Sequence, residues 1–204
     1  MSPQNNRAAM RRFLTAVAIG GASILLLAGC SESTELEGSG PDNYVSGDGT
    51  VSEFPLENRQ DPIEFSSISD TGDEISAADF RGEVVVVNFW YAACPPCRVE
   101  APWLQELAEQ FGDADVQFLG VNVRDSAVTS RAFADSFGIT YPSVLDARTK
   151  DVTSSFTGLA SPAAVPTTVV LDRDGRPASR IVGLIESSTL ESLIESALSE
   201  PQSD

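Results

Sequence analysis

The chain has 204 residues and a formal net charge of −17, because 30 Asp and Glu residues outnumber 13 Lys and Arg residues. It contains no histidine, which excludes histidine metal ligands and a Cys–His nucleophile of the protease type. The excess of acid argues against nucleic acid as a partner, since phosphates require Lys and Arg for neutralisation.

The N-terminus has the three-part layout of a bacterial export signal. Three arginines precede an apolar run over residues 13–28, and this run is shorter than the about 20 apolar residues that a membrane span needs. The alternative is an uncleaved anchor helix. The run leads into Leu-Ala-Gly-Cys, which resembles a bacterial lipobox and ends at Cys30. The sequence therefore predicts a lipoprotein signal peptide over residues 1–29 and a lipid on Cys30, which would hold the protein at the extracytoplasmic face of the cell membrane.

Residues 31–60 are rich in Ser, Gly, Glu and Asp and show no sustained periodicity. Such a composition buries too little apolar surface to offset the entropy of ordering it. We therefore expect a flexible tether over residues 30–60, followed by a single domain over residues 61–204.

Within that domain the apolar residues alternate between the strand period and the helix period. The predicted elements are a strand–turn–strand segment over 63–75, a buried strand over 84–90, a helix over 96–111, a strand over 116–123, a helix over 126–137, a strand pair over 167–171 and 178–182, and a helix over 190–198. This order predicts an α/β fold, with a central mixed sheet, helices on both faces and an N-terminal strand extension.

Cys94 and Cys97 lie in the segment "NFWYAACPPCRVE", directly after the most apolar strand. A zinc site would need further ligands, and a structural cross-link over so short a loop would stabilise by only about 2 kcal/mol. Redox chemistry is the third alternative and the one that we favour. The next helix begins here, and its N-terminus stabilises a thiolate. We expect Cys94 to attack and Cys97, one turn further in and more buried, to resolve.

Several motifs together resemble those of the thioredoxin superfamily: "VVVVNFW", "CPPC" and "AVPTTVVLDRDG". The segment "CPPCRVEAPWL" is more narrowly similar to the TlpA/ResA-like membrane-tethered thiol–disulfide oxidoreductases. The resemblance implies a thioredoxin-like fold whose redox centre is a Cys94–Cys97 disulfide, with no other cofactor and no metal. It also implies a cis peptide bond at Pro166, where the backbone of Val165 and Pro166 would bind the substrate chain.

Two positions depart from the common thioredoxin pattern. Asn88 stands where thioredoxins commonly have a buried Asp, so it cannot carry a proton. Glu100 stands where ResA-like proteins have an acid near the active site, which implies a catalytic role. The alternative for Glu100 is a solvated acid near the helix start, favoured by the helix dipole. Ala93 replaces the Trp that many relatives have before the first cysteine.

The resemblance implies an extracytoplasmic enzyme that exchanges dithiols and disulfides with exported proteins. Its relatives act as reductants, some on apocytochrome c during cytochrome c maturation, and a membrane thiol-transfer protein keeps them reduced. We expect a monomer. Potentials of such motifs span about −270 to −120 mV, so the motif alone leaves the direction of electron flow open.

Two other functions remain as alternatives. One is a thiol peroxidase of the peroxiredoxin type, although Tyr91 occupies the position where those enzymes have Thr or Ser. The other is a non-enzymatic thioredoxin-like binding lipoprotein, which would not require both Cys94 and Cys97.

Overall fold

The computed structural model describes residues 43–46, 49–161 and 163–201. Cys30 and the predicted signal peptide lie outside the described residues. The strands are β1 (Asn43–Ser46), β2 (Gly49–Glu53), β3 (Ser66–Ile68), β4 (Glu74–Ser76), β5 (Val84–Trp90), β6 (Val116–Asn122), β7 (Ser143–Leu145), β8 (Thr167–Leu171) and β9 (Pro177–Gly183). The α-helices are α1 (Pro95–Gln110), α2 (Ala127–Phe137), α3 (Asp151–Ser155) and α4 (Ser187–Leu198), with short 3₁₀ turns at Leu56–Asn58 and Ala77–Phe80.

The main sheet is mixed and has the strand order β1-β2-β9-β8-β5-β6-β7. Strand β5 lies at its centre, parallel to β6 and antiparallel to β8. All seven β5 residues are buried, as expected for a continuous β-branched run that is covered on both faces. The cysteine pair follows directly on this strand, so the most buried part of the fold positions the site.

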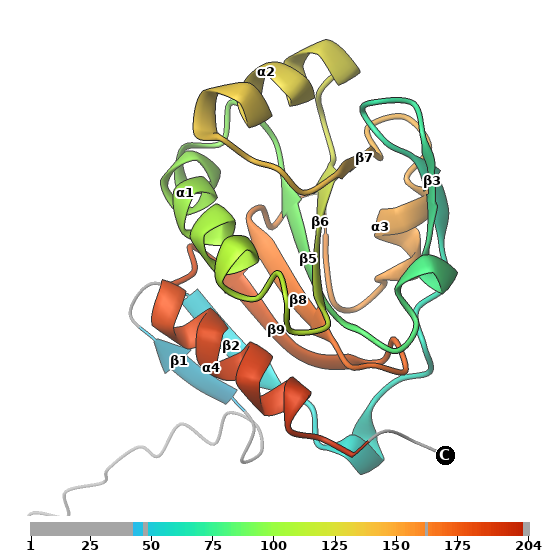
Figure 1. The fold of residues 1–204 in the computed structure, drawn as a ribbon, viewed down its shortest axis with the longest axis vertical. Helices are drawn as coiled ribbons and strands as arrows, with labels where there is room; N and C mark the ends of the chain where they lie inside the picture. Colours follow the sequence, from blue (N-terminus) through green and yellow to red (C-terminus); the bar gives the residue numbers. More distant parts are fainter. Residues whose placement is uncertain (1–42, 47–48, 162, 202–204) are drawn as a thin grey trace, which may run out of the picture. The chain divides into compact units, whose positions relative to one another are not determined.

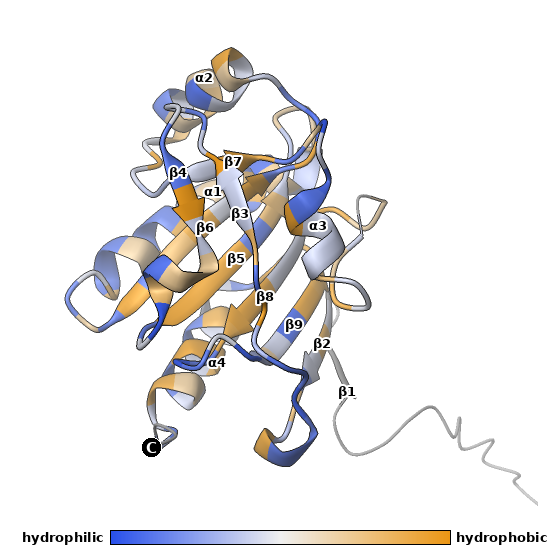
Figure 2. Cartoon of the chain, turned by 90° about the vertical axis from the view of Figure 1, so that its right-hand side faces the viewer, coloured by the Kyte–Doolittle hydropathy of each residue, from blue (hydrophilic) through white to orange (hydrophobic). Residues whose placement is uncertain are grey.

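Helices cover both faces of this sheet, as predicted (Figure 1). Alternate β5 residues point to opposite sides. Val84 and Val86 pack with apolar side chains of α1 and α4, whereas Val85 and Val87 pack with Val152 and other residues of the α3 side. Strands β3 and β4 form a separate two-stranded sheet, whose β3 strand lies near α3 (Figure 2). No helix among the described residues combines the length and the apolar character that crossing a membrane requires.

The C-terminal boundary of the predicted tether is wrong. Strand β2 pairs with β9 through the register from Gly49 with Gly183 to Glu53 with Ser179, and Val51 within it is 4 % exposed. The domain therefore begins before residue 61. The polar composition around this short strand concealed it, because its pairing partner lies more than 120 residues further along the chain.

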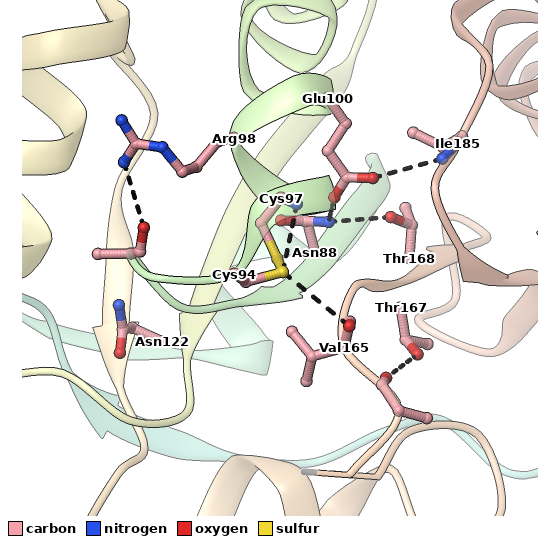
Figure 3. Close-up of a disulfide and its surroundings, with 12 residues drawn as sticks. Asn88, Cys94, Cys97, Arg98, Glu100, Asn122, Val165, Thr167, Thr168 and Ile185 are labelled. Atoms are coloured by element: carbon pink, nitrogen blue, oxygen red, sulfur yellow. Dashed lines mark hydrogen bonds between the residues drawn. A yellow bond between two sulfur atoms is a disulfide. The ribbon is translucent and has the colours of Figure 1, made fainter.

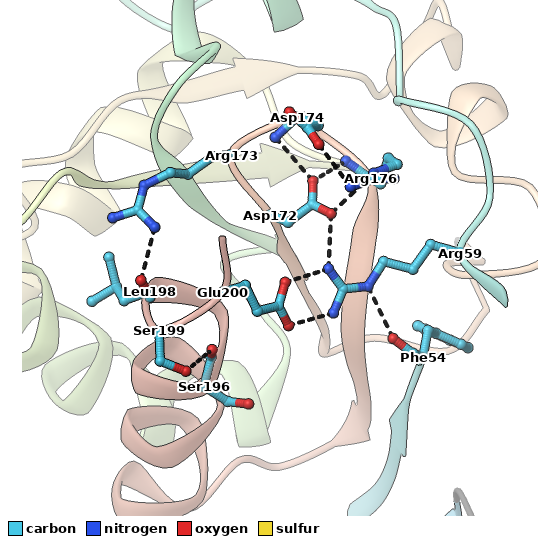
Figure 4. Close-up of polar contacts among 10 residues, drawn as sticks. All are labelled: Phe54, Arg59, Asp172, Arg173, Asp174, Arg176, Ser196, Leu198, Ser199 and Glu200. Carbon is cyan, nitrogen blue, oxygen red and sulfur yellow. Dashed lines mark hydrogen bonds and ion pairs between the residues drawn. The ribbon is translucent and has the colours of Figure 1, made fainter. Parts of the chain in front are cut away.

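Arg59, which the sequence also placed in the tether, lies in a buried network of charges (Figure 4). Its guanidinium binds both carboxylate oxygens of Glu200 at 2.5 and 2.6 Å and one oxygen of Asp172 at 2.8 Å. Its Nε donates to the Phe54 carbonyl. The Arg59 side chain is only 5 % exposed. The network therefore joins the segment after β2 to the β8–β9 turn and to the residues after α4.

Candidate active site

Cys94 is the N-cap residue of α1, as predicted from the strand–helix boundary. Its N–H donates to the Tyr91 carbonyl at 3.1 Å, which closes the turn between β5 and α1. The Cys97 N–H donates to Cys94 Sγ at 3.2 Å. Pro95 and Pro96 fill the first helical positions, where a missing N–H removes no helical hydrogen bond. A helix N-terminus with an N–H directed at sulfur favours a thiolate at Cys94.

The two cysteines are joined in a disulfide, with an S–S distance of 2.07 Å and Cα atoms 5.3 Å apart (Figure 3). The expectation that Cys97 is the more buried of the two is wrong: Cys94 is 1 % exposed and Cys97 2 %. Tyr91, Ala92 and Val165 pack against the apolar cluster that contains both cysteines, and the Val165 carbonyl lies next to Cys94 Sγ. The positions of the two cysteines along α1 did not predict the burial of Cys94, because Val165 belongs to a loop 71 positions further along the chain.

The peptide bond between Val165 and Pro166 is cis, as the resemblance implied. The Val165 carbonyl oxygen lies 4.0 Å from Cys94 Sγ. A disulfide sulfur has no proton to donate, so this is a contact in the oxidised form, and the reduced thiol could donate to the same oxygen. The Val165 N–H donates no hydrogen bond to any residue that the structure describes. Val165 therefore presents an open backbone beside the reactive sulfur.

Glu100 lies in the second turn of α1 and is fully buried, so it is not the solvated helix-start acid that was the alternative. Asn88 on β5 donates its side-chain amide to Glu100 Oε1 at 2.9 Å and to Thr168 Oγ1 at 3.0 Å. The Ile185 N–H donates to Glu100 Oε2 at 3.4 Å. Figure 3 shows this group beside the disulfide. Asn88 thus positions a carboxyl group rather than carrying a proton itself.

Burial raises the pKa of Glu100 to about 8, and the hydrogen bonds from Asn88 and Ile185 oppose only part of that increase. Loss of hydration disfavours the ionised carboxylate more than two hydrogen bonds can restore. Glu100 is therefore largely protonated at neutral pH. Burial also raises the pKa of Tyr141, and the charge of Glu100 adds to that increase. Tyr141 is therefore part of the buried surroundings of Glu100, although the sequence analysis did not identify it.

A further pair, Asn122 and Asp125, supports the loop that carries Cys94. Asp125 Oδ2 accepts hydrogen bonds from the Ala92 N–H at 2.6 Å and from the Asn122 side chain at 2.9 Å. Asn122 Oδ1 accepts from the N–H groups of Arg124 and Asp125. The sequence pattern that indicates this pair is a set of polar residues at the carboxyl end of a buried strand, since parallel strands bring their carboxyl ends to one edge of the sheet. The prediction from sequence did not include it.

The arrangement unites Cys94, Cys97, Glu100, Val165 and Pro166 at one edge of the sheet. Two sulfurs that can open and reclose a disulfide lie next to a buried acid and an open backbone. In the described part of the chain, no three His, Cys, Asp or Glu residues are grouped so that they could hold a metal ion.

Comparisons with known proteins agree with this geometry. Residues 59–176 match the model of the AhpC/TSA family. The chain is 32 % identical over 125 residues to the thiol-disulfide oxidoreductase ResA of Geobacillus kaustophilus, which covers 61 % of this chain and 69 % of that protein. It is 28 % identical over 145 residues to the thioredoxin-like protein YneN of Bacillus subtilis, covering 70 % and 82 %.

The fold also matches a solved structure, the secreted thiol-disulfide isomerase from Corynebacterium glutamicum. The TM-score is 0.69 and the identity 30 %, and the match covers 79 % of this chain and all of that one. The predicted thioredoxin-like fold is thereby confirmed.

Proposed function

The chain belongs to the AhpC/TSA family and is a thiol–disulfide oxidoreductase, and we propose that it reduces disulfides of exported proteins at the outer face of a bacterial cell membrane. The observation that carries the proposal is the position of Cys94 Sγ. It lies at the N-terminus of α1, receives the Cys97 N–H and faces the open backbone of Val165.

In the proposed reaction the Cys94 thiolate attacks one sulfur of the substrate disulfide. A bond forms between Cys94 and that sulfur, and the other substrate sulfur leaves as a thiolate that takes up a proton. The Cys97 thiolate then attacks Cys94 Sγ, which releases the second substrate thiol and closes the Cys94–Cys97 disulfide. Two electrons pass to the substrate, and the two thiols of the protein supply the protons.

The backbone of Val165 provides a way to hold the substrate chain. Its N–H and carbonyl groups can pair with an extended peptide, as in strand addition at a sheet edge. Such backbone pairing would place the substrate sulfur near Cys94 whatever the side chains of the substrate are. Glu100, which lies in the turn of α1 after Cys97, would exchange protons with the thiols during the two steps.

The substrate class and the location rest on the resemblance. We propose that the protein is lipidated on Cys30, acts as a monomer, and is kept reduced by a membrane thiol-transfer protein. Apocytochrome c is the substrate that we propose by the same resemblance. Replacing Cys30 with Ser in a bacterial host should abolish labelling by a radioactive fatty acid, and unchanged labelling would refute the lipid anchor.

The direction of electron flow is tested by the reduction potential of the Cys94–Cys97 couple. The protein is equilibrated with glutathione or dithiothreitol redox buffers, and its thiols are counted after alkylation. A reductant should have a potential below about −200 mV, near thioredoxins rather than near the strong oxidants at about −120 mV. A value close to −120 mV would show that the protein oxidises its substrates instead.

The peroxidase alternative is not the function that the site supports best. Tyr91, three residues before Cys94, is partly buried under the Arg124 guanidinium, so no Thr or Ser hydroxyl stands at that position to bind a peroxide. Consumption of hydrogen peroxide by the reduced protein, at a rate above that of a simple dithiol, would bring this alternative back.

A further inference from the structure

A surface pocket of about 730 Å³ lies beside the loop that carries Cys94. Strand β3 forms one side of it, and the loops β6–α2 and β7–α3 form the others. Both loops follow the carboxyl ends of parallel strands, the edge at which α/β folds place ligands. The volume is within the range of pockets that bind small molecules or side chains. We call it the Arg124–Arg148 pocket, after the two cations that line it.

The pocket contacts the active-site loop directly. The Arg124 guanidinium lies over the ring of Tyr91, 4.0 Å from its centroid. The Val123 N–H donates to the Trp90 carbonyl at 3.1 Å, and the Cys94 N–H donates to the Tyr91 carbonyl. A residue bound in this pocket would therefore lie next to the loop that carries Cys94.

Arg124 and Arg148 are distinctive among the cations. Within the described residues, they are the Lys and Arg side chains that donate no hydrogen bond and form no ion pair. The others donate to carboxylates or to backbone carbonyls: Arg59, Arg81, Arg98, Arg131, Lys150, Arg173, Arg176 and Arg180. In a chain with a net charge of −17, it is notable that both of these arginines line one pocket.

Two acids also line the pocket, and neither forms an ion pair with an arginine in the described part of the chain. Asp125 is held by the Ala92 N–H and by Asn122. Asp151 is exposed in the first turn of α3. Ile68 on β3 adds apolar surface, since this residue is 52 % exposed. The pocket thus offers two guanidinium groups and an apolar contact.

We propose that the Arg124–Arg148 pocket binds an acidic segment of the partner protein, with Asp or Glu and an apolar residue a few positions from the cysteine that reacts with Cys94. This inference rests on the proposed function and names the substrate class for the same site. Acidic partners are repelled by most of this chain, so two arginines that form no ion pair with a described residue and line one pocket next to the active-site loop would both attract and orient them.

The test uses two synthetic peptides that contain the same intramolecular disulfide, flanked by Asp-Leu-Asp in one and by Asn-Leu-Asn in the other. Each peptide is mixed with the reduced full-length protein. Oxidation of the Cys94–Cys97 dithiol then yields two peptide thiols, which are quantified with time. We expect the acidic peptide to react about three- to tenfold faster at low salt. This preference should largely disappear at 1 M salt, where charges are screened within about 3 Å.

Arg124→Gln and Arg148→Gln should each lower the preference about two- to threefold, and the double variant should abolish it. Arg173→Gln is the matched control. It removes the same charge from the β8–β9 turn, which lies at the opposite end of β5 from Cys94, and it should keep the full preference. Equal rates for the two peptides with the wild type, or an undiminished preference in the double variant, would overturn the inference.

A small uncharged disulfide, bis(2-hydroxyethyl) disulfide, separates this inference from the proposed function. It should oxidise the wild type and Arg148→Gln at equal rates, which also shows that this variant is folded. Failure to oxidise the wild type would refute the proposed function itself. Vesicles of anionic phosphatidylglycerol are the last comparison. Binding that depends on Arg124 and Arg148, without any peptide preference, would assign the pocket to lipid headgroups and overturn the inference.

Discussion

The Asn88 side chain donates a 2.9 Å hydrogen bond to the carboxyl group of Glu100 across the interface between β5 and α1. The bond links the central strand to the helix that carries both cysteines. It also fixes a carboxyl group whose pKa is raised to about 8 by burial. The site therefore holds an acid that changes its charge in the same pH range in which thiols ionise.

We expect Glu100→Gln to lower the apparent pKa of the attacking thiol. An ionised Glu100 disfavours a nearby thiolate, and a neutral glutamine removes that repulsion. The three groups titrate as a coupled set in the wild type, so the apparent values belong to the set. The measurement is the alkylation rate of the reduced protein against pH. Glu106→Gln, an exposed change on the same helix, is the control, and superimposable profiles for all three proteins would show that Glu100 does not act on the thiols.

The same residue should give the protein a measurable pH dependence of stability. Because the folded-state pKa of about 8 lies above the usual value of 4.5, the folded protein binds the proton more tightly. The contribution of Glu100 to the free energy of unfolding is then largest below about pH 4.5 and is lost as the pH rises to about 8. Each pKa unit corresponds to about 1.4 kcal/mol, so the loss is a few kcal/mol. Urea unfolding of oxidised wild type and Glu100→Gln between pH 4.5 and 9 should show this slope only in the wild type.

The roles of the two cysteines predict opposite outcomes for their serine variants. Cys97→Ser should accumulate mixed disulfides with partner proteins, because nothing resolves the bond at Cys94. Cys94→Ser should accumulate none or very few, since the remaining Cys97 thiol does not occupy the N-cap position of α1 that favours a thiolate. Non-reducing gels of cell extracts, with and without dithiothreitol, provide the measurement. Adducts confined to Cys94→Ser would mean that the roles are reversed.

Arg59→Met should destabilise the domain by about 3 kcal/mol, because it removes the cation that the buried Asp172 shares with the largely buried Glu200, and among the described residues only Asp172 keeps another ion pair, with Arg176. Glu64→Gln removes an exposed ion pair with Arg81 and should cost less than about 1 kcal/mol. Urea unfolding at pH 7 compares the two variants. Equal, small losses for both would show that the Arg59 network contributes no more than a surface pair.

The elements that carry a strong local signal were predictable from the sequence. The β5 run, the α1 helix from its prolines onward, and α2 between Ser126 and Gly138 appear almost as expected, because apolar period and capping residues are encoded locally. Strand β7 and helix α3 were missed. They are only three and five residues long, too short for a period to show.

The residues of the site also differ in how far the local sequence predicts their positions. Cys94 and Cys97 are only three positions apart, so their place at a helix start followed from the neighbouring residues. The contacts of Glu100 with Asn88 and Ile185 span 12 and 85 positions, and no local pattern predicts such a pairing. The burial of Cys94 under Val165 has the same origin, as does the place of Arg59 in the domain.

The pairing of β2 with β9 has a practical consequence for anyone who expresses the domain alone. A recombinant fragment that starts at residue 61, where the composition changes, would lack two strands of the main sheet, β1 and β2, and the Arg59 guanidinium that binds Asp172 and Glu200. The exposed edge of β9 would then be open to pairing between copies, which leads to aggregation. A fragment that starts at or before residue 43 keeps both features, and its C-terminus should extend beyond Glu200, so that a purification tag does not displace the carboxylate that Arg59 binds.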